Sequence, residues 1–187
     1  MKRLVLLAAL LPTALFSIAG HAKARGPLGS GHLSLKLSYL NFTDDHLDSV
    51  DDGGYLALEV FGRVARRLYI GGELGAGGNV VALGHDVSVL PIEASAKYVP
   101  YIARNLVVAI GAGAAICRVS SESNFLIFKL DKRSDFLFGG QLFVDLAFVL
   151  ESFTVGLDAK CQITQDFEGA DWDASTFRIG IQLGYVL

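Results

Sequence analysis

The sequence predicts an all-β fold, an eight-stranded antiparallel up-and-down transmembrane β-barrel. Hydrophobic residues make up 52% of the 187 residues, yet beyond the N-terminal region no run reaches the ~20 apolar residues that a membrane-spanning helix needs. Apolar side chains fall instead on alternate positions of eight segments, which is the period of a β-strand. The connections between these segments are alternately short and long.

The N-terminal region predicts export from the cytoplasm. Residues 1–24 begin with Lys2 and Arg3, continue with an apolar stretch, and end in small-residue patterns that allow cleavage after Ala22 or Ala24. These are the features of a secretory signal peptide; an uncleaved N-terminal helix is the alternative. We expect residues 25–30, which contain the sequence GPLGS, to form a flexible linker and residues 31–187 to form the barrel domain.

The charge of the exported chain excludes one class of partner. Removing Lys2, Arg3 and Lys23 reduces the 16 basic residues to 13, against 19 acidic residues, which is a formal net charge of about −6. A chain of this charge repels the phosphates of nucleic acid, so nucleic acid is a poor partner.

The first four segments set apolar residues against small or charged ones. Residues 33–39 (LSLKLSY) alternate leucine and tyrosine with serine and lysine, and residues 55–64 (YLALEVFGRV) alternate leucine and valine with positions that include glutamate and arginine. Residues 68–77 (LYIGGELGAG) set leucine and isoleucine against glycine and glutamate. Residues 90–98 (LPIEASAKY) set leucine, isoleucine and alanine against glutamate, serine and lysine. We therefore expect four strands here.

The last four segments repeat the pattern. Residues 106–113 (LVVAIGAG) place leucine, valine and isoleucine opposite alanine and glycine, and residues 136–148 (FLFGGQLFVDLAF) place phenylalanine, leucine and valine opposite glycine, glutamine and aspartate. Residues 153–164 (FTVGLDAKCQIT) alternate apolar residues with glycine, aspartate and lysine. Residues 176–187 (TFRIGIQLGYVL) do the same with arginine, glycine and glutamine. The total is eight strands.

The connections predict the orientation of the barrel. Tight turns fall at residues 65–66, 103–104 and 151, whereas the connections at residues 41–53, 78–87, 119–134 and 165–175 are long and polar. Short turns at one end and long loops at the other, on an even number of strands, are typical of an outer-membrane barrel with both termini in the periplasm.

The glycines indicate which face of the strands points inward. Nine glycines lie on the charged face: Gly71, Gly75, Gly77, Gly111, Gly113, Gly139, Gly156, Gly180 and Gly184. The interior of an eight-stranded barrel is only wide enough for side chains, so small residues there make room for long ones. We therefore expect the charged face inside. A soluble lipocalin-like barrel with its apolar face inside is the alternative.

Ten charged residues of that face form the predicted interior network. Five are basic and five are acidic: Lys36, Arg63, Lys97, Lys160, Arg178, Glu59, Glu73, Glu93, Asp145 and Asp158. Isolated buried charges are costly, so a set with balanced signs is what a side-chain network inside a barrel requires. A solvated face of mixed charge would show the same balance.

Aromatic residues mark both ends of the apolar face. Four fall at the short-turn end and four at the long-loop end: Tyr98, Phe148, Phe153 and Tyr185, then Tyr39, Phe136, Phe138 and Phe177. Two aromatic rings that bracket aliphatic residues match the girdles at the two membrane interfaces. Packing of the same residues in a soluble core is the alternative.

These features resemble the small eight-stranded outer-membrane barrels of Gram-negative bacteria, of the OmpX, OmpW and opacity-protein type. The resemblance covers nearly all of residues 31–187 and includes the terminal IGIQLGYVL and the strand-turn-strand stretch at residues 90–115. It implies an outer-membrane location, contact with lipid and lipopolysaccharide, and delivery by periplasmic chaperones and the barrel-insertion machinery. Family members usually end in Phe or Trp, whereas this sequence ends in Leu187, with Tyr185 two residues earlier.

Loop residues with catalytic or metal-binding chemistry are few. DDHLDS at residues 44–49 and GHDVS at residues 84–88 each place a histidine beside a carboxylate and a serine, the groups that an activated nucleophile needs; we expect neither to be catalytic. Acidic clusters at residues 44–52 and 166–173 could bind divalent cations but lack the spacing of a calcium loop. Cys117 and Cys161 lie two strands apart, so we expect free thiols.

The third long connection carries the predicted interaction surface. In SNFLIFKLDKRSD, residues 123–135, four consecutive apolar residues precede three basic ones: Phe125, Leu126, Ile127, Phe128, Lys129, Lys132 and Arg133. Polar loops seldom carry such a patch. The fifth and sixth strands could extend as a protruding hairpin that docks the patch over the barrel mouth or presents it to a partner; a collapsed loop that buries its own apolar residues is the alternative.

The sequence therefore predicts a monomeric, non-enzymatic barrel without a cofactor, with a structural role or an interaction role carried by its loops. Passage or binding of small hydrophobic molecules, as the resemblance to the OmpW type implies, is the alternative. An outer-leaflet lipid-modifying enzyme is a weaker one.

Overall fold

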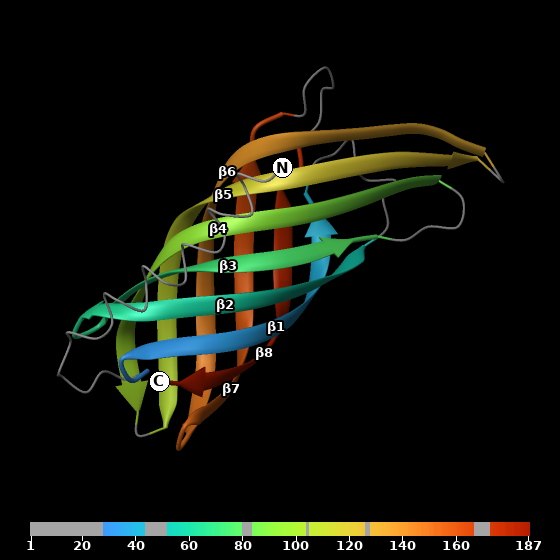
Figure 1. The fold of residues 1–187 in the computed structure, drawn as a ribbon. Helices are drawn as coiled ribbons and strands as arrows, with labels where there is room; N and C mark the ends of the chain where they lie inside the picture. Colours follow the sequence, from blue (N-terminus) through green and yellow to red (C-terminus); the bar gives the residue numbers. More distant parts are fainter. Residues whose placement is uncertain (1–27, 44–51, 80–83, 104, 126–127, 167–172) are drawn as a thin grey trace.

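The chain forms a closed antiparallel barrel in which sequential strands are neighbours and β8 pairs with β1 (Figure 1). The computed structural model describes residues 28–43, 52–79, 84–103, 105–125, 128–166 and 173–187. The strands are β1 (Gly31–Phe42), β2 (Gly53–Ala65), β3 (Leu68–Gly78), β4 (Gly84–Ala103), β5 (Leu106–Phe125), β6 (Phe128–Leu150), β7 (Phe153–Thr164) and β8 (Thr176–Val186). The predicted fold class and all eight predicted strands are confirmed.

Side-chain burial alternates along the strands as the period-2 pattern predicts. Outward positions carry exposed apolar residues such as Leu142 and Ile163, whose side chains are 67% and 66% exposed, whereas the charged residues of the opposite face are almost fully buried. An apolar surface around the outside of a barrel wall suits contact with lipid rather than water.

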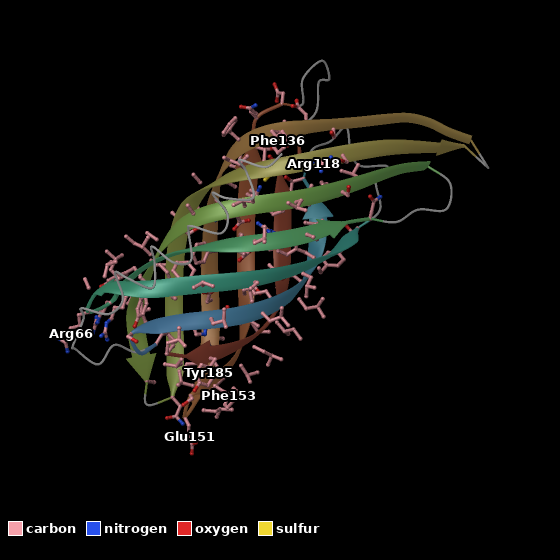
Figure 2. All side chains as sticks on the ribbon, in the orientation of Figure 1. Arg66, Arg118, Phe136, Glu151, Phe153 and Tyr185 are labelled. Atoms are coloured by element: carbon pink, nitrogen blue, oxygen red, sulfur yellow. The ribbon has the colours of Figure 1, made fainter. Side chains whose placement is uncertain are left out.

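The height of the outward apolar surface matches a membrane. On β7 it extends from Phe153 to Ile163, which at ~3.3 Å per residue and a strand tilt of ~40° corresponds to roughly 25 Å. Phe153 and Tyr185 pack edge to face with ring centroids 5.4 Å apart, and Figure 2 shows both near Glu151 at the short-turn end, far from Phe136 and Arg118. All eight predicted girdle aromatics are exposed.

Strands β4, β5 and β6 continue past the ends of their neighbours. β5 and β6 remain paired out to Phe125 and Phe128, whereas β7 pairs with β6 only from Gly139 onward. Figure 1 shows this extension leaving the barrel at one end. The prediction of a long polar loop at residues 119–134 was therefore wrong for most of its length, whereas the predicted extension of the fifth and sixth strands as a hairpin is confirmed. The predicted connection at residues 78–87 is also too long, because residues 84–87 belong to β4. Strand pairing continues through polar residues once they lie outside the apolar zone.

None of the described residues forms a helix with the length and hydrophobicity needed to cross a membrane. The expected signal peptide, residues 1–24, lies outside the described residues and stays a prediction.

Candidate functional site: a filled barrel interior and a strand extension

The structure places all ten predicted interior charges inside the barrel. They come from seven of the eight strands, and each is no more than 5% exposed. Opposite charges from different strands meet near the middle of the barrel, and most of the ion pairs join strands that have no backbone contact with each other.

Glu59 organises one half of this network. Its carboxylate accepts from Lys97 Nζ at 2.7 Å and lies 2.7 Å from Lys36 Nζ, and Ser34 Oγ donates to it at 3.1 Å. Lys97 Nζ also lies 2.7 Å from Asp145 Oδ2. Lys97 contacts two carboxylates and Lys36 contacts three, so the removal of any one member would leave the buried charges around it with fewer partners.

Glu73 and Glu93 organise the other half. Lys160 Nζ lies 2.8 Å from Glu73 and 2.5 Å from Glu93. Arg178 Nη2 donates to Glu93 Oε1 at 2.7 Å, and its guanidinium lies over the ring of Tyr55, 4.2 Å from the centroid. Tyr55 in turn donates its hydroxyl proton to Glu73 at 2.9 Å.

Glycines provide the space that these long side chains need. A Cβ atom on Gly75 would collide with the Tyr55 hydroxyl, and one on Gly111 would collide with the ring of Phe143. Phe143 packs near Phe61 with ring centroids 6.4 Å apart, and Lys97 Nζ lies 4.2 Å from the Phe61 centroid. Small residues on the inner face therefore make room for rings, as predicted.

The interior also contains two apolar clusters that sequence reasoning missed. One lies toward the long-loop end and includes Leu40, Phe42, Val87, Val89, Cys117, Val119 and Leu137. The other lies at the short-turn end and includes Leu28, Phe61, Tyr69, Val99, Val107 and Phe143. The signal was present, because Leu40, Val89 and Leu137 are in phase with the charged positions of their strands.

The residues just before β1 close the short-turn end. Leu28 is buried among the second apolar cluster, and its backbone N–H donates to Tyr69 Oη at 3.0 Å. The backbone N–H and the hydroxyl of Ser30 each donate to the carbonyl oxygen of Leu187 at 2.8 Å. Residues 28–30 therefore do not fit the predicted flexible linker, because burial of Leu28 and these hydrogen bonds fix them against the barrel.

The interior contains one constellation with the groups of a catalytic triad. His32 Nε2 lies 2.9 Å from Thr154 Oγ1, and His32 Nδ1 lies 3.9 Å from Glu59 Oε1. All three residues are buried, and the 3.9 Å separation exceeds hydrogen-bond length. A hydroxyl nucleophile needs a base in contact and a substrate in reach. Because all three side chains are buried, we interpret this group as polar side chains that fill the interior, where His32 and Thr154 share a hydrogen bond.

The predicted loop residues are only partly described. Residues 44–51, with His46, and the side chain of His85 lie outside the described part, as does most of the second acidic cluster. Within the described residues, no group of three histidine, cysteine or acidic side chains is placed to hold a metal ion. Cys117 and Cys161 are free, as predicted: Cys117 points inward and Cys161 outward.

The β6 side of the strand extension is an open edge. Within the described part of the chain, residues 128–137 of β6 pair with β5 on one side and have no strand on the other. Phe125 and Phe128 are direct partners at the tip; the side chains of residues 121–133 lie outside the described part. An open edge presents unpaired backbone N–H and C=O groups to a partner strand.

Comparison with known proteins identifies the architecture. The sequence matches no protein-family model and no curated protein. The crystal structure of Neisserial surface protein A (NspA) matches with a TM-score of 0.71, covering 85% of this chain and 98% of that chain at 10% identity. The fold is that of the small outer-membrane barrels.

Two further crystal structures share this fold. Ail, the attachment invasion locus protein of Yersinia pestis, matches with a TM-score of 0.55 at 10% identity, and OprG from Pseudomonas aeruginosa matches with a TM-score of 0.55 at 14% identity. Each comparison covers 83% of this chain and 95% of the other. The predicted resemblance to small outer-membrane barrels is confirmed at the level of the fold.

Proposed function

We propose that this chain is a monomeric, non-enzymatic protein of the bacterial outer membrane that acts through the surface carried by its β5–β6 extension. The short-turn end, with both termini, faces the periplasm, and the extension stands on the cell surface. The observation that carries this proposal is the contrast between an interior filled by charged and apolar side chains and an open strand edge, which offers a docking surface.

The filled interior argues against conduction of ions. Nine ion-pair contacts within 4.0 Å join the interior lysines and Arg178 to carboxylates, and apolar clusters lie on either side of them. In planar bilayers the purified protein should show little or no steady conductance. Large and stable channels would overturn the filled interior.

The extension supports an interaction role. Phe125 and Phe128 of the predicted patch are partners at its tip, and in sequence the patch continues through Leu126 and Ile127 and is followed by the basic residues Lys129, Lys132 and Arg133. A partner strand would pair with the open edge, and the basic side chains would bind lipopolysaccharide phosphates. Ail, which shares this fold, is described as an attachment invasion locus protein, and this is in keeping with attachment at a cell surface.

The test replaces the apolar tip. The double variant Phe125→Ser, Phe128→Ser should keep the heat-modifiable mobility of a folded barrel on gels and lose binding to lipopolysaccharide or to cultured host cells. The matched double variant Phe125→Leu, Phe128→Leu keeps the patch apolar and should retain binding. Undiminished binding by the serine variant would show that the tip is not the functional surface.

The location has its own test. The protein should fractionate with outer membranes and reach them through the periplasmic chaperones and the barrel-insertion machinery. Recovery as a soluble periplasmic protein would overturn the membrane assignment.

Binding of small hydrophobic molecules is the second candidate, and one observation favours it. The apolar cluster near the long-loop end lines the inside of the barrel. The cavity beside it, between Leu40, Val89, Cys117 and Arg178, has a volume of only about 10 Å³, which is room for about one water molecule. Saturable uptake of an alkane by vesicles containing the protein, absent from empty vesicles, would favour this candidate over the first.

A further inference from the structure

The charges of the central network do not balance. Four cations, Lys36, Lys97, Lys160 and Arg178, face the five carboxylates of Glu59, Glu73, Glu93, Asp145 and Asp158. The fifth interior cation, Arg63, lies on β2 next to the β2–β3 turn, and its backbone N–H donates to Ser30 O. Within the described residues, the four cations of the network form ion pairs with four of the carboxylates and with none of the oxygens of the fifth.

Asp158 is that fifth carboxylate. Each of the other four lies within ion-pair distance of at least two cations. Among the described residues Asp158 has neither an ion pair nor a hydrogen bond, although it is only 3% exposed, and its Oδ1 is fully buried without a donor. An ionised carboxylate in that position would carry most of its desolvation cost uncompensated.

The neighbours of Asp158 explain what it can bind. Asp145 of β6 is its direct partner across the β6–β7 ladder, so two carboxylates lie side by side on the inner face. The other charged groups that act on it are Lys36 of β1, Glu73 of β3 and Lys160 of its own strand. On the β8 side, Gly180 is its ladder partner and contributes no side chain, and Gln182 Oε1 is a buried acceptor without a donor.

We propose that Asp145 and Asp158 form a proton-binding site, in which Asp158 is a neutral carboxylic acid at neutral pH and shares its proton with Asp145. Two like charges directly opposite on neighbouring strands repel each other, and two carboxylates that share a site retain one proton between them. The proton brings the network to four charges of each sign and gives Asp158 a donor for one of the orphaned oxygens around it.

A metal cation is the competing occupant, and the structure favours the proton. The described residues contain no group of three acidic, histidine or cysteine side chains placed to hold a metal ion. Lys36 and Lys97 already occupy the other side of Asp145, where a cation would meet two ammonium groups. A proton needs only two oxygens in contact.

Infrared spectroscopy tests the proposal directly. The protein, labelled with 13C-aspartate and folded in an ester-free detergent at neutral pH, should show the carbonyl band of a protonated aspartic acid, which shifts in D2O. Asp158→Asn should lose this band and keep the unfolding temperature. Glu151→Gln, which changes an exposed turn carboxylate, should keep both.

Three outcomes would overturn the proposal: absence of the band from the unmodified protein, survival of the band in Asp158→Asn, or an unfolding temperature that rises with sodium but not with choline at equal ionic strength. If Asp158→Asn does not fold, the spectrum of the unmodified protein still decides. At alkaline pH, loss of the proton restores the repulsion, so the unmodified protein should lose stability faster than Asp158→Asn.

Discussion

Arg178 of β8 and Glu93 of β4 join opposite walls of the barrel, with Nη2 2.7 Å from Oε1. The two strands lie four places apart in an eight-stranded ring, so this ion pair crosses the lumen. Arg178→Leu would leave Glu93 and Glu73 buried with fewer partners and should lower the free energy of unfolding by about 3–5 kcal/mol. Urea titration in lipid vesicles, followed by heat-modifiable gel mobility, measures this.

The control for that change is Arg66→Leu. Arg66 lies exposed in the β2–β3 turn (Figure 2), so its loss should change the same free energy by no more than ~0.5 kcal/mol. Equal effects of the two substitutions would show that the lumen network does not stabilise the barrel.

Glycine positions on the inner face should tolerate no methyl group where a ring fills the space. Gly111→Ala would push its Cβ into the Phe143 ring and should destabilise the barrel by about 1–3 kcal/mol through overpacking. The matched change is Gly54→Ala, because a Cβ there meets no atom within 4 Å; it should be neutral or slightly stabilising. The same urea titration compares the two, and a neutral Gly111→Ala would contradict the packing described for the lumen.

The hydroxyl of Tyr69 fixes the N-terminal segment. It accepts from Leu28 N–H at 3.0 Å and donates to Gly29 O at 3.5 Å. Tyr69→Phe should cost about 1 kcal/mol and should speed hydrogen exchange at the Leu28 amide. Tyr98→Phe, at an outward position, serves as the control and should leave that exchange rate unchanged; if Tyr69→Phe also leaves it unchanged, the segment is held by other contacts.

Arginine substitutions along β6 locate the membrane. Leu142 points outward near the middle of the strand and Ser134 points outward on the extension. Leu142→Arg should destabilise the barrel folded in vesicles by about 2–4 kcal/mol, and Ser134→Arg should destabilise it by ~1 kcal/mol or less. A similar loss of stability at both positions would contradict a lipid boundary between Leu142 and Ser134.

Alternation and glycine placement were enough to predict the strands and the inward face, because both follow from the geometry of a closed sheet. The ten interior charges were predicted by the same logic. Leu40, Val89 and Leu137 were missed as interior residues, because alternation marks the inner face only where its residues are charged or small. Only three-dimensional packing shows that the lumen changes from apolar to charged and back along its length.

Strand ends were harder to predict than strand centres. The alternation fades after Cys117 and before Phe136, where polar residues such as Ser120 and Ser134 occupy the outward phase, yet these two are direct partners in the β5–β6 ladder. Backbone pairing continues without lipid contact, so hydropathy carries no signal for it. The burial of Leu28 could not be predicted from the local sequence either, because it depends on contacts with Tyr69, 41 residues away.

The contact between Ser30 and Leu187 spans 157 residues of sequence and can form only after β1 has met β8. It therefore reports the final event of assembly, since every hairpin can exist without it and only a closed ring brings the two residues together. The amide of Ser30 should be the last to gain protection from hydrogen exchange during refolding, which makes a single backbone group the marker that distinguishes a finished barrel from an open sheet.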